Sequence, residues 1–222
     1  MRVLKSFIPA VALMAVVPAA FAQSYGGLSL AYVRNSATCP DGPAGYCSAK
    51  HLGGLAYVGA KLAESSQLDL GIGKLDAFEA GLMQLGSKSF NQDVVTSRLV
   101  SSVRVYTTTT DSGLMSANGL YGAGVAHMDL AEDLQMVARL GVSYVSTTLK
   151  KSRVVTTSQG AYTYTSLGSS TDNRWQPFVG VGLEYKLMNE LILSSRLDMT
   201  RVSANSRNGM AALFSVGAQI VY

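Results

Sequence analysis

The sequence predicts an all-β chain that closes into an antiparallel, up-and-down transmembrane barrel. The last stretch, residues 210–222, alternates apolar residues with small or polar ones and ends on an aromatic residue. Its 13 residues exceed the roughly 9–11 that a tilted strand needs to cross a bilayer. The first stretch, residues 1–22, is typical of an export signal, and no later apolar run approaches the roughly 18 residues of a spanning helix. An exported chain that stays in a membrane must then cross it with strands.

The first 22 residues predict a cleaved secretory signal peptide. Arg2 and Lys5 form a basic start, IPAVALMAVVPAA forms an apolar core, and Ala20-Phe21-Ala22 ends the segment with an A-x-A-like cleavage site. The alternative is a membrane-anchoring helix, which is disfavoured because Pro9 and Pro18 interrupt a short apolar run. We therefore expect a signal peptide over residues 1–22 and one barrel domain over residues 23–222.

The composition of the mature chain fits many short strands and excludes a nucleic-acid partner. The full sequence holds 22 glycines and 11 tyrosines, and only 14% of it is charged. Removing Arg2 and Lys5 with the signal leaves 16 basic and 14 acidic residues. A net charge of +2, scattered along the chain, is too small for a nucleic-acid interface.

Two cysteines lie close together in the segment SATCPDGPAGYC, as Cys39 and Cys47. Prolines and glycines between them predict a tight loop, and such a pair in an exported protein usually forms a disulfide. Two thiols without a neighbouring histidine partner do not indicate a metal site. The predicted bond would stiffen an exposed loop.

Six segments in the first part of the chain alternate with the period of two that is typical of a β-strand. They are residues 26–35, 51–63, 68–73, 77–86, 98–106 and 114–130. A polar turn is expected over residues 64–67, and Asp111-Ser112-Gly113 is a hairpin-turn signal.

The last third of the chain alternates most clearly. Its strands are predicted over residues 135–146, 176–187, 191–202 and 210–222. Short turns at 131–134 and 188–190 alternate with longer polar connections at 149–173 and 203–209, as periplasmic turns alternate with extracellular loops. Counting every segment gives ten strands. We favour eight, with part of residues 51–118 extending above the membrane as loop hairpins.

Charged residues occupy the interleaved face of otherwise apolar strands. They are Arg104, Arg139, Glu184, Lys186, Arg196 and Asp198. An Arg or Lys facing lipid at mid-depth would cost roughly 2–4 kcal/mol. Inside a narrow barrel, opposite charges can pair and side chains can fill the interior. We expect a lumenal charge network rather than an open channel; the alternative, a soluble sandwich, would leave Tyr, Leu and Val stripes in water.

Several segments resemble the OmpA-like and OmpX-like family of small outer-membrane barrels. They are AFEAGLMQLG, LAEDLQMVARLGVSYV, PFVGVGLEYKL, ELILSSRLDMTRV and LFSVGAQIVY. The resemblance covers about half of the chain and is poor over residues 35–118. It implies eight strands, an outer-membrane location, interior positions for Arg139, Glu184, Arg196 and Asp198, and no peptidoglycan-binding domain in this chain. It also implies that the barrel-assembly machinery recognises the last strand, through Phe214, Ile220 and Tyr222, where Tyr222 replaces the family's usual terminal Phe.

The sequence predicts no enzyme, cofactor or metal site. Of the two histidines, His51 follows the cysteine loop with Ser48 close by, and His127 shares a face with Asp129. His127 is expected near the periplasmic end, whereas barrel enzymes act at the outer leaflet or rim. No Gly-rich phosphate loop, CxxC or HExxH motif is present.

Three functions remain open. The first is a barrel with a plugged lumen that serves envelope structure or limited passage of small solutes. The second is a surface adhesin that binds host or matrix molecules through loops 39–47 and 154–173. The third, which the sequence favours least, is an enzyme acting on lipopolysaccharide. Lys150, Lys151 and Arg153 are candidate contacts to lipopolysaccharide phosphates, and the alternative for them is a solvated loop base.

Overall fold

The computed structural model describes residues 23–36, 47–69, 71, 73–100, 103–204 and 207–222. The predicted signal peptide and Cys39 lie outside these residues, so the predicted disulfide to Cys47 lies outside them as well. Within the described part of the chain, no helix is long and apolar enough to cross a membrane.

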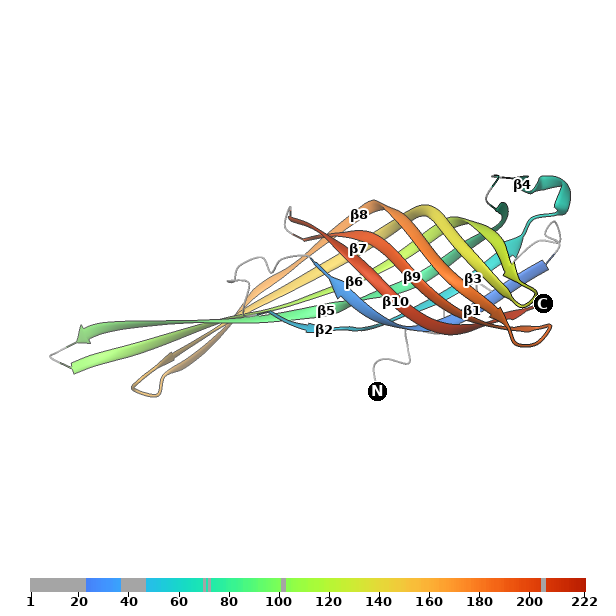
Figure 1. Cartoon of the computed structure of the whole chain (residues 1–222). Helices are drawn as coiled ribbons and strands as arrows, with labels where there is room; N and C mark the ends of the chain where they lie inside the picture. Colours follow the sequence, from blue (N-terminus) through green and yellow to red (C-terminus); the bar gives the residue numbers. More distant parts are fainter. Residues whose placement is uncertain (1–22, 37–46, 70, 72, 101–102, 205–206) are drawn as a thin grey trace.

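Eight strands pair in one closed antiparallel ring (Figure 1). They are β1 (Gln23–Asn35), β3 (Leu52–Lys61), β5 (Lys74–Val100), β6 (Val103–Ala131), β7 (Leu134–Thr157), β8 (Tyr162–Lys186), β9 (Leu191–Ala204) and β10 (Arg207–Val221). Each ring strand pairs with the next one along the chain. The last strand closes the ring on the first, with Leu28 opposite Ala218. The predicted up-and-down barrel is confirmed.

Two short strands lie outside the ring, which settles the strand number at eight. β2 (Cys47–Lys50) and β4 (Leu68–Asp69) each pair only with β5. A one-turn 3₁₀ helix, Glu64–Ser66, occupies the predicted turn after β3. The strand predicted over residues 98–106 is wrong, because the hairpin between β5 and β6 turns in the middle of it.

Four ring strands, β5 to β8, continue past the barrel as a protruding sheet, which we call the extension (Figure 1). The β5–β6 ladder runs to Val100 opposite Val103, and the β7–β8 ladder runs to Thr156 opposite Tyr162. The predicted loop 149–173 is therefore mostly strand, and the turn predicted at 111–113 lies within β6. Threonine-rich segments favour strands and pair well across a ladder even without an apolar face.

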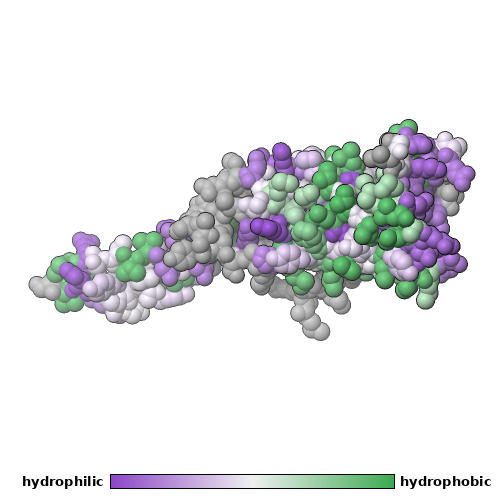
Figure 2. All heavy atoms as spheres, in the orientation of Figure 1, coloured by the Kyte–Doolittle hydropathy of each residue, from purple (hydrophilic) through white to green (hydrophobic). Residues whose placement is uncertain are grey.

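Apolar side chains gather over the middle of the barrel on the face that Figure 2 shows, with polar ones toward its ends. On β8 the outward residues run from Tyr185 to Trp175, a span of 11 residues that matches a tilted membrane strand. Other outward residues that are more than half exposed include Leu28, Leu30, Leu120, Leu140, Val142, Phe214, Val216 and Ile220. A closed barrel with such a band is a transmembrane barrel, and its location is the outer membrane.

The orientation follows from the connections. The short connections at residues 132–133 and 187–190 lie at the end that also holds the start of β1 and the end of β10, opposite the extension (Figure 1). Short turns face the periplasm in such barrels, so the extension lies outside the cell.

The interior of the barrel is packed with the alternate set of side chains. In β10, Leu213 and Gln219 are buried, whereas Phe214 and Ile220 are exposed, as the alternation predicts. Larger buried side chains include Tyr25, Leu55, Tyr57, Met83, Tyr121, Val137, Val145 and Phe178.

Candidate functional sites

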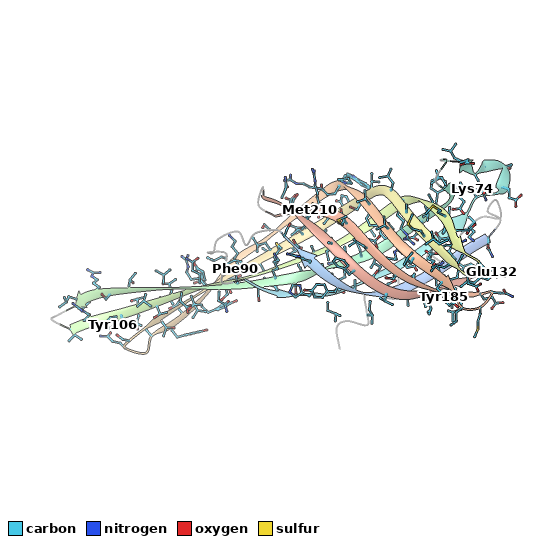
Figure 3. All side chains as sticks on the ribbon, viewed as in Figure 1. Lys74, Phe90, Tyr106, Glu132, Tyr185 and Met210 are labelled. Carbon is cyan, nitrogen blue, oxygen red and sulfur yellow. The ribbon has the colours of Figure 1, made fainter. Side chains whose placement is uncertain are left out.

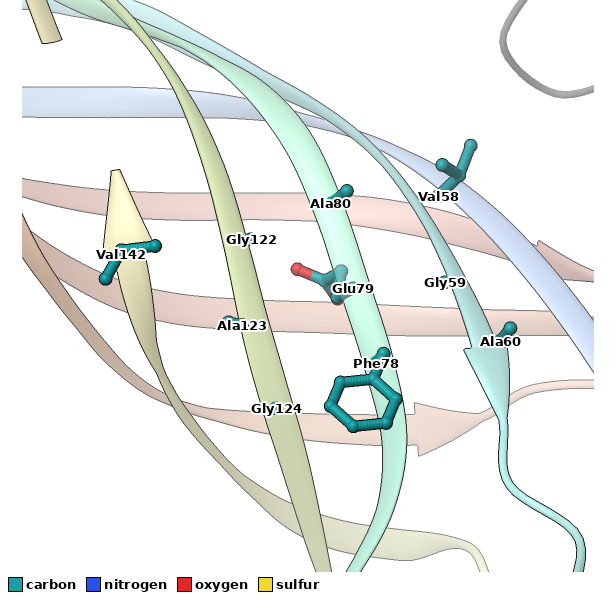
Figure 4. A pocket seen from close by; sticks show the side chains of 10 residues that line it. All are labelled: Val58, Gly59, Ala60, Phe78, Glu79, Ala80, Gly122, Ala123, Gly124 and Val142. Atoms are coloured by element: carbon teal, nitrogen blue, oxygen red, sulfur yellow. The ribbon is translucent and has the colours of Figure 1, made fainter. Parts of the chain in front are cut away.

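Glu79 lies at the centre of the polar interior. The alternation of β5 turns Phe78 and Ala80 outward and Glu79 inward (Figure 4). The Glu79 residue is 3% exposed. A buried carboxylate is stable only with charged or hydrogen-bonding partners.

Glu79 receives its partners from four other strands. Its Oε1 accepts hydrogen bonds from Arg196 Nη2 at 2.7 Å and from the Tyr121 hydroxyl at 2.5 Å. Its Oε2 accepts from Arg139 Nε at 3.4 Å and from the Tyr25 hydroxyl at 3.5 Å. Both oxygens are therefore engaged, and one carboxylate holds two guanidinium groups.

A second carboxylate, Glu184, continues the network toward the periplasmic end. Arg139 Nη2 donates to Glu184 Oε1 at 2.8 Å, and Gln219 Nε2 donates to Glu184 Oε2 at 3.1 Å. His127 Nε2 lies 3.7 Å from Glu184 Oε2, and its Nδ1 lies 2.5 Å from Asp76 Oδ1. The polar network thus extends from Glu79 to the imidazole of His127.

Arg196 is enclosed on its remaining sides. Its Nε lies 3.2 Å from Asp198 Oδ2, and its guanidinium carbon lies 4.4 Å from the centre of the Tyr57 ring. The Tyr57 hydroxyl lies 3.3 Å from Gln219 Oε1 and 3.4 Å from Ser194 Oγ. A cation against an aromatic face gains about 2 kcal/mol when desolvated, which helps to offset the burial of this charge.

These contacts cross the lumen. Each ring strand contributes a polar side chain to the network, in chain order Tyr25, Tyr57, Glu79, Tyr121, Arg139, Glu184, Arg196 and Gln219. The charge-assisted hydrogen bonds among these buried groups are of the stronger kind.

Four of the charged residues predicted for the lumen, Arg139, Glu184, Arg196 and Asp198, meet in this network. The other two do not. Arg104 is exposed near the tip of the extension, opposite Leu99, and Lys186 is exposed at the periplasmic end of β8. Alternation predicts the face of a residue but not its depth along the barrel, so both predictions were wrong.

Sequence reasoning left Glu79 out of the network. The signal that could have found it was present, because Glu79 shares the face opposite Phe78 and Ala80 in a predicted strand. The tyrosine hydroxyls of the network were also missed, since a tyrosine on an alternating strand suits either face.

His127 does not contact its predicted partner Asp129, and the side chain of Ser48, the predicted partner of His51, lies outside the described side chains. His127 contacts Asp76 rather than Asp129, which accepts a hydrogen bond from Gln135 Nε2 at 2.7 Å. His51 Nδ1 lies 2.8 Å from the Val33 carbonyl oxygen, and its ring stacks on Tyr32 at 4.9 Å. Across the described residues, no cluster of His, Cys, Asp or Glu is placed to hold a metal ion.

The three basic residues predicted to contact lipopolysaccharide have different surroundings. Arg153 makes a bidentate pair with Asp111, with Nε–Oδ1 and Nη2–Oδ2 distances of 2.6 and 2.8 Å. The hydrogen bond from Arg153 lowers the pKa of the Asp111 carboxyl group from its ordinary value. Lys150 and Lys151 instead border a polar hollow of about 510 Å³ on β5–β8.

The two sides of the extension are open strand edges. Among the described strands, residues 91–100 of β5 pair only with β6, and residues 162–177 of β8 pair only with β7. Apolar side chains gather there, with Val94, Val95, Leu99, Val103, Tyr162 and Tyr164 between 46% and 65% exposed. Figure 3 shows side chains projecting from both faces of these strands.

No family model matches the chain, and no curated protein matches it. Solved structures similar to it include Ail, the attachment invasion locus protein of Yersinia pestis, at 9% identity and a TM-score of 0.45, covering 90% of this chain and 98% of that one. Neisserial surface protein A matches at 9% identity and a TM-score of 0.36, covering 89% and 96%. The N-terminal β-barrel domain of Pseudomonas aeruginosa OprF matches at 12% identity and a TM-score of 0.39, covering 90% and 97%.

Proposed function

We propose that this chain is a structural protein of the outer membrane, a barrel whose lumen is plugged by its own side chains. The observation that supports this role is the buried network around Glu79, in which Arg196 of β9 pairs with Glu79 of β5 across the ring and Arg139 of β7 also pairs with Glu79. A barrel closed in this way adds a rigid, membrane-spanning body to the envelope and conducts few solutes. We propose no catalytic role and no cofactor.

Conductance in planar lipid bilayers tests this proposal. The refolded protein is expected to insert without producing stable current steps, while a trimeric porin measured in the same bilayer gives them. Insertion is verified by heat-modifiability of the reconstituted sample on a gel. Stable unitary steps from a heat-modifiable preparation would contradict a plugged lumen and favour limited passage of small solutes.

A second candidate function is binding at the cell surface through the extension. Among the described residues, its edges pair with no further strand, and exposed Val, Leu and Tyr side chains line them. Open strand edges are templates for pairing with a strand of another protein. Segment 154–173, predicted as a contact loop, forms much of one edge, whereas residues 39–46 of the other predicted loop lie outside the described part of the chain.

Trimming the extension tests this candidate. Residues 93–110 and 154–164 are each replaced by Asn-Gly, which joins strand positions that already face each other, Gln92 with Asp111 and Arg153 with Thr165. Cells displaying the full barrel should adhere to immobilised matrix proteins or host cells, and the trimmed barrel should not. Equal adherence at equal surface display would contradict a role for the extension.

We also propose that the chain is exported by its signal peptide and assembled through its last strand. Phe214 and Ile220 point outward from β10, and Tyr222 directly after it is exposed, so an assembly factor could contact all three before the ring closes. Replacing Tyr222 by Ser should lower the amount of heat-modifiable barrel in the outer membrane, and Tyr222→Phe should preserve it. If Tyr222→Ser assembled as well as the wild-type chain, Tyr222 would not be part of the proposed assembly signal.

A further inference from the structure

The outer wall changes from apolar to polar at one step of the ladder on four neighbouring strands. Leu82, Leu120, Tyr144 and Trp175 lie opposite one another on β5, β6, β7 and β8. The next outward positions on the same strands are Gln84, Asn118, Ser146 and Asn173, which also lie opposite one another. The apolar band therefore ends against a row of side-chain amides and a hydroxyl.

Further polar rows follow toward the extension. Ser87, Ser116, Thr148 and Thr171 form the next outward row, and Asn91, Ser112, Ser152 and Ser166 lie two rows beyond it. Between these two rows stand Ser89, Leu114, Lys150 and Ser169. The hydroxyl oxygens of Thr148 and Thr171 lie 3.3 Å apart, so these side chains share one face. The wall above the membrane therefore carries mostly small hydroxyl and amide groups, interrupted by Leu114 and Lys150.

A bulge hollows this face. Between the pairs Lys150–Ser169 and Ser152–Ser166, two residues of β8 oppose one of β7. One of the two, Gly168, has φ of +90°, which favours glycine. The hollow of about 510 Å³ lies here, bordered among others by Asn91, Ser112, Lys150, Tyr164 and Ser169.

The groups that border the hollow match a phosphorylated saccharide. Serine hydroxyls and the Asn91 amide can both donate to and accept from sugar hydroxyls. The Lys150 ammonium is a point charge suited to a phosphate, and the Tyr164 ring offers an apolar face to sugar C–H groups. No Asp or Glu is among the described residues that border the hollow. Arg153 contributes no charge here, since its side chain pairs with Asp111.

A second hollow, of about 500 Å³ and almost wholly apolar, lies in the membrane band on β3, β5, β6 and β7 (Figure 4). Its floor is formed by small residues, Ala60, Ala80, Gly122 and Gly124, between Phe78 and Val142. Along β6 the two hollows are eight residues apart, from Gly122 to Leu114, or about 26 Å at a rise of about 3.3 Å per residue. An acyl chain over the lower hollow would need a headgroup several sugars long to reach the upper one. A glycerophosphate headgroup is too short.

We infer that the outer wall formed by β3 and β5–β8 binds a lipopolysaccharide molecule of the outer leaflet. The phosphorylated core saccharide occupies the polar hollow with a phosphate on Lys150, and an acyl chain lies over the apolar hollow. This inference rests on the proposed role in the outer membrane, and it assigns Lys150, rather than Arg153, as the phosphate contact.

Binding of purified lipids to the refolded barrel in nanodiscs tests the inference. Lipopolysaccharide with a phosphorylated core is compared with lipid A alone and with phosphatidylglycerol. We expect the barrel to bind lipopolysaccharide at least tenfold more tightly than it binds lipid A or phosphatidylglycerol. Lys150→Ala and Ser169→Leu should each weaken lipopolysaccharide binding at least fivefold. Lys186→Ala, which removes an exposed lysine at the other end of the barrel, should leave it unchanged.

Three results would overturn the inference. They are equal affinity for lipopolysaccharide and phosphatidylglycerol, wild-type affinity in both Lys150→Ala and Ser169→Leu, and binding of the free core oligosaccharide as tight as that of intact lipopolysaccharide. The last would identify a soluble glycan rather than a membrane lipid as the ligand. Heat-modifiability is recorded for every sample. A heat-modifiable barrel that fails to bind lipopolysaccharide contradicts only the inferred binding site. A wild-type chain that does not form a barrel contradicts the proposed function.

Discussion

Glu79 is the residue on which the charge balance of the lumen depends. Its carboxylate lies between Arg139 and Arg196, and all three side chains are at most 1% exposed. Replacing Glu79 by Gln keeps the shape but removes the negative charge, so two buried guanidinium groups would face each other without their shared partner. Breaking a buried ion pair in this way typically costs about 3–5 kcal/mol.

We therefore expect Glu79→Gln to lower the free energy of unfolding by several kcal/mol. The measurement is urea unfolding of the barrel in micelles, followed by the fluorescence of Trp175, the only tryptophan. Asp111→Asn is the matched control: it also removes one carboxylate from an Arg pair, but at an exposed site where ion pairs contribute little. Equal effects of the two substitutions would contradict the buried network.

The exposed pair Asp111–Arg153 gives a prediction on pH. The Arg153 hydrogen bond lowers the pKa of Asp111 below its ordinary value of 3.8. A carboxylate with a lowered pKa stabilises the folded extension above that ordinary value, and this contribution is lost as the pH falls through the lower pKa of the folded state. NMR titration of the Asp111 carboxyl carbon should give a midpoint below 3.8. Arg153→Ala should move the midpoint upward, and an unchanged midpoint would show that the pair does not persist in solution.

At the scale of elements, β1 and β3 are fitted together by two glycine–tyrosine pairs. Gly27 lies opposite Tyr57, and Tyr25 lies opposite Gly59. A Cβ atom on Gly27 would collide with the Tyr57 ring, and one on Gly59 would collide with the Tyr25 ring. Each glycine therefore leaves the space in which a tyrosine of the lumenal network lies.

Gly27→Ala and Gly59→Ala should each destabilise the barrel by about 1–3 kcal/mol, the usual effect of overpacking. Gly122→Ala is the control within the same barrel, since an added Cβ there meets nothing within 4 Å. The urea midpoints of the three variants distinguish the sites. If Gly122→Ala lowered the urea midpoint as much as the other two substitutions, the glycines would be required for their backbone conformation rather than to make room for the tyrosine rings.

Sequence reasoning reached the strands of the membrane band because lipid imposes a strict pattern on them. In β10, every second residue must be apolar, so the outward set of Phe214, Val216 and Ile220 was readable. The same reasoning did not predict all the strand residues of the extension. Water lies on both faces of residues 107–112, so no alternation marks them as strand, and the polar signal at Asp111 suggested a turn.

The sequence predicted which charged residues lie in the lumen better than it predicted which of them contact each other. The pairing of His127 with Asp76 joins residues 51 positions apart and depends on the register between β5 and β6. Arg104 and Lys186 show the same limit, because period two repeats identically along a strand and holds no information on depth. Glu79 was readable as an inward acid, but its central place follows only from closing the ring.

At the scale of the whole molecule, the barrel and the extension have separate sources of stability. The ring is closed by β10 on β1, and the polar network connects its interior strands. The extension beyond Gln92 and Arg153 contributes no residue to that network. Its own stabilising contacts are ladder hydrogen bonds and surface side chains, and the latter contribute little in water.

The barrel trimmed at residues 93–110 and 154–164 should therefore fold as well as the full chain. Its urea midpoint and its heat-modifiability should match those of the full barrel, because no closing pair and no lumenal ion pair is removed. Glu79→Gln made in the trimmed barrel should produce the same loss of stability as in the full one, since distant and independent changes add. A trimmed chain that no longer folds would show that the extension nucleates or holds the ring, and that the two parts form one cooperative unit.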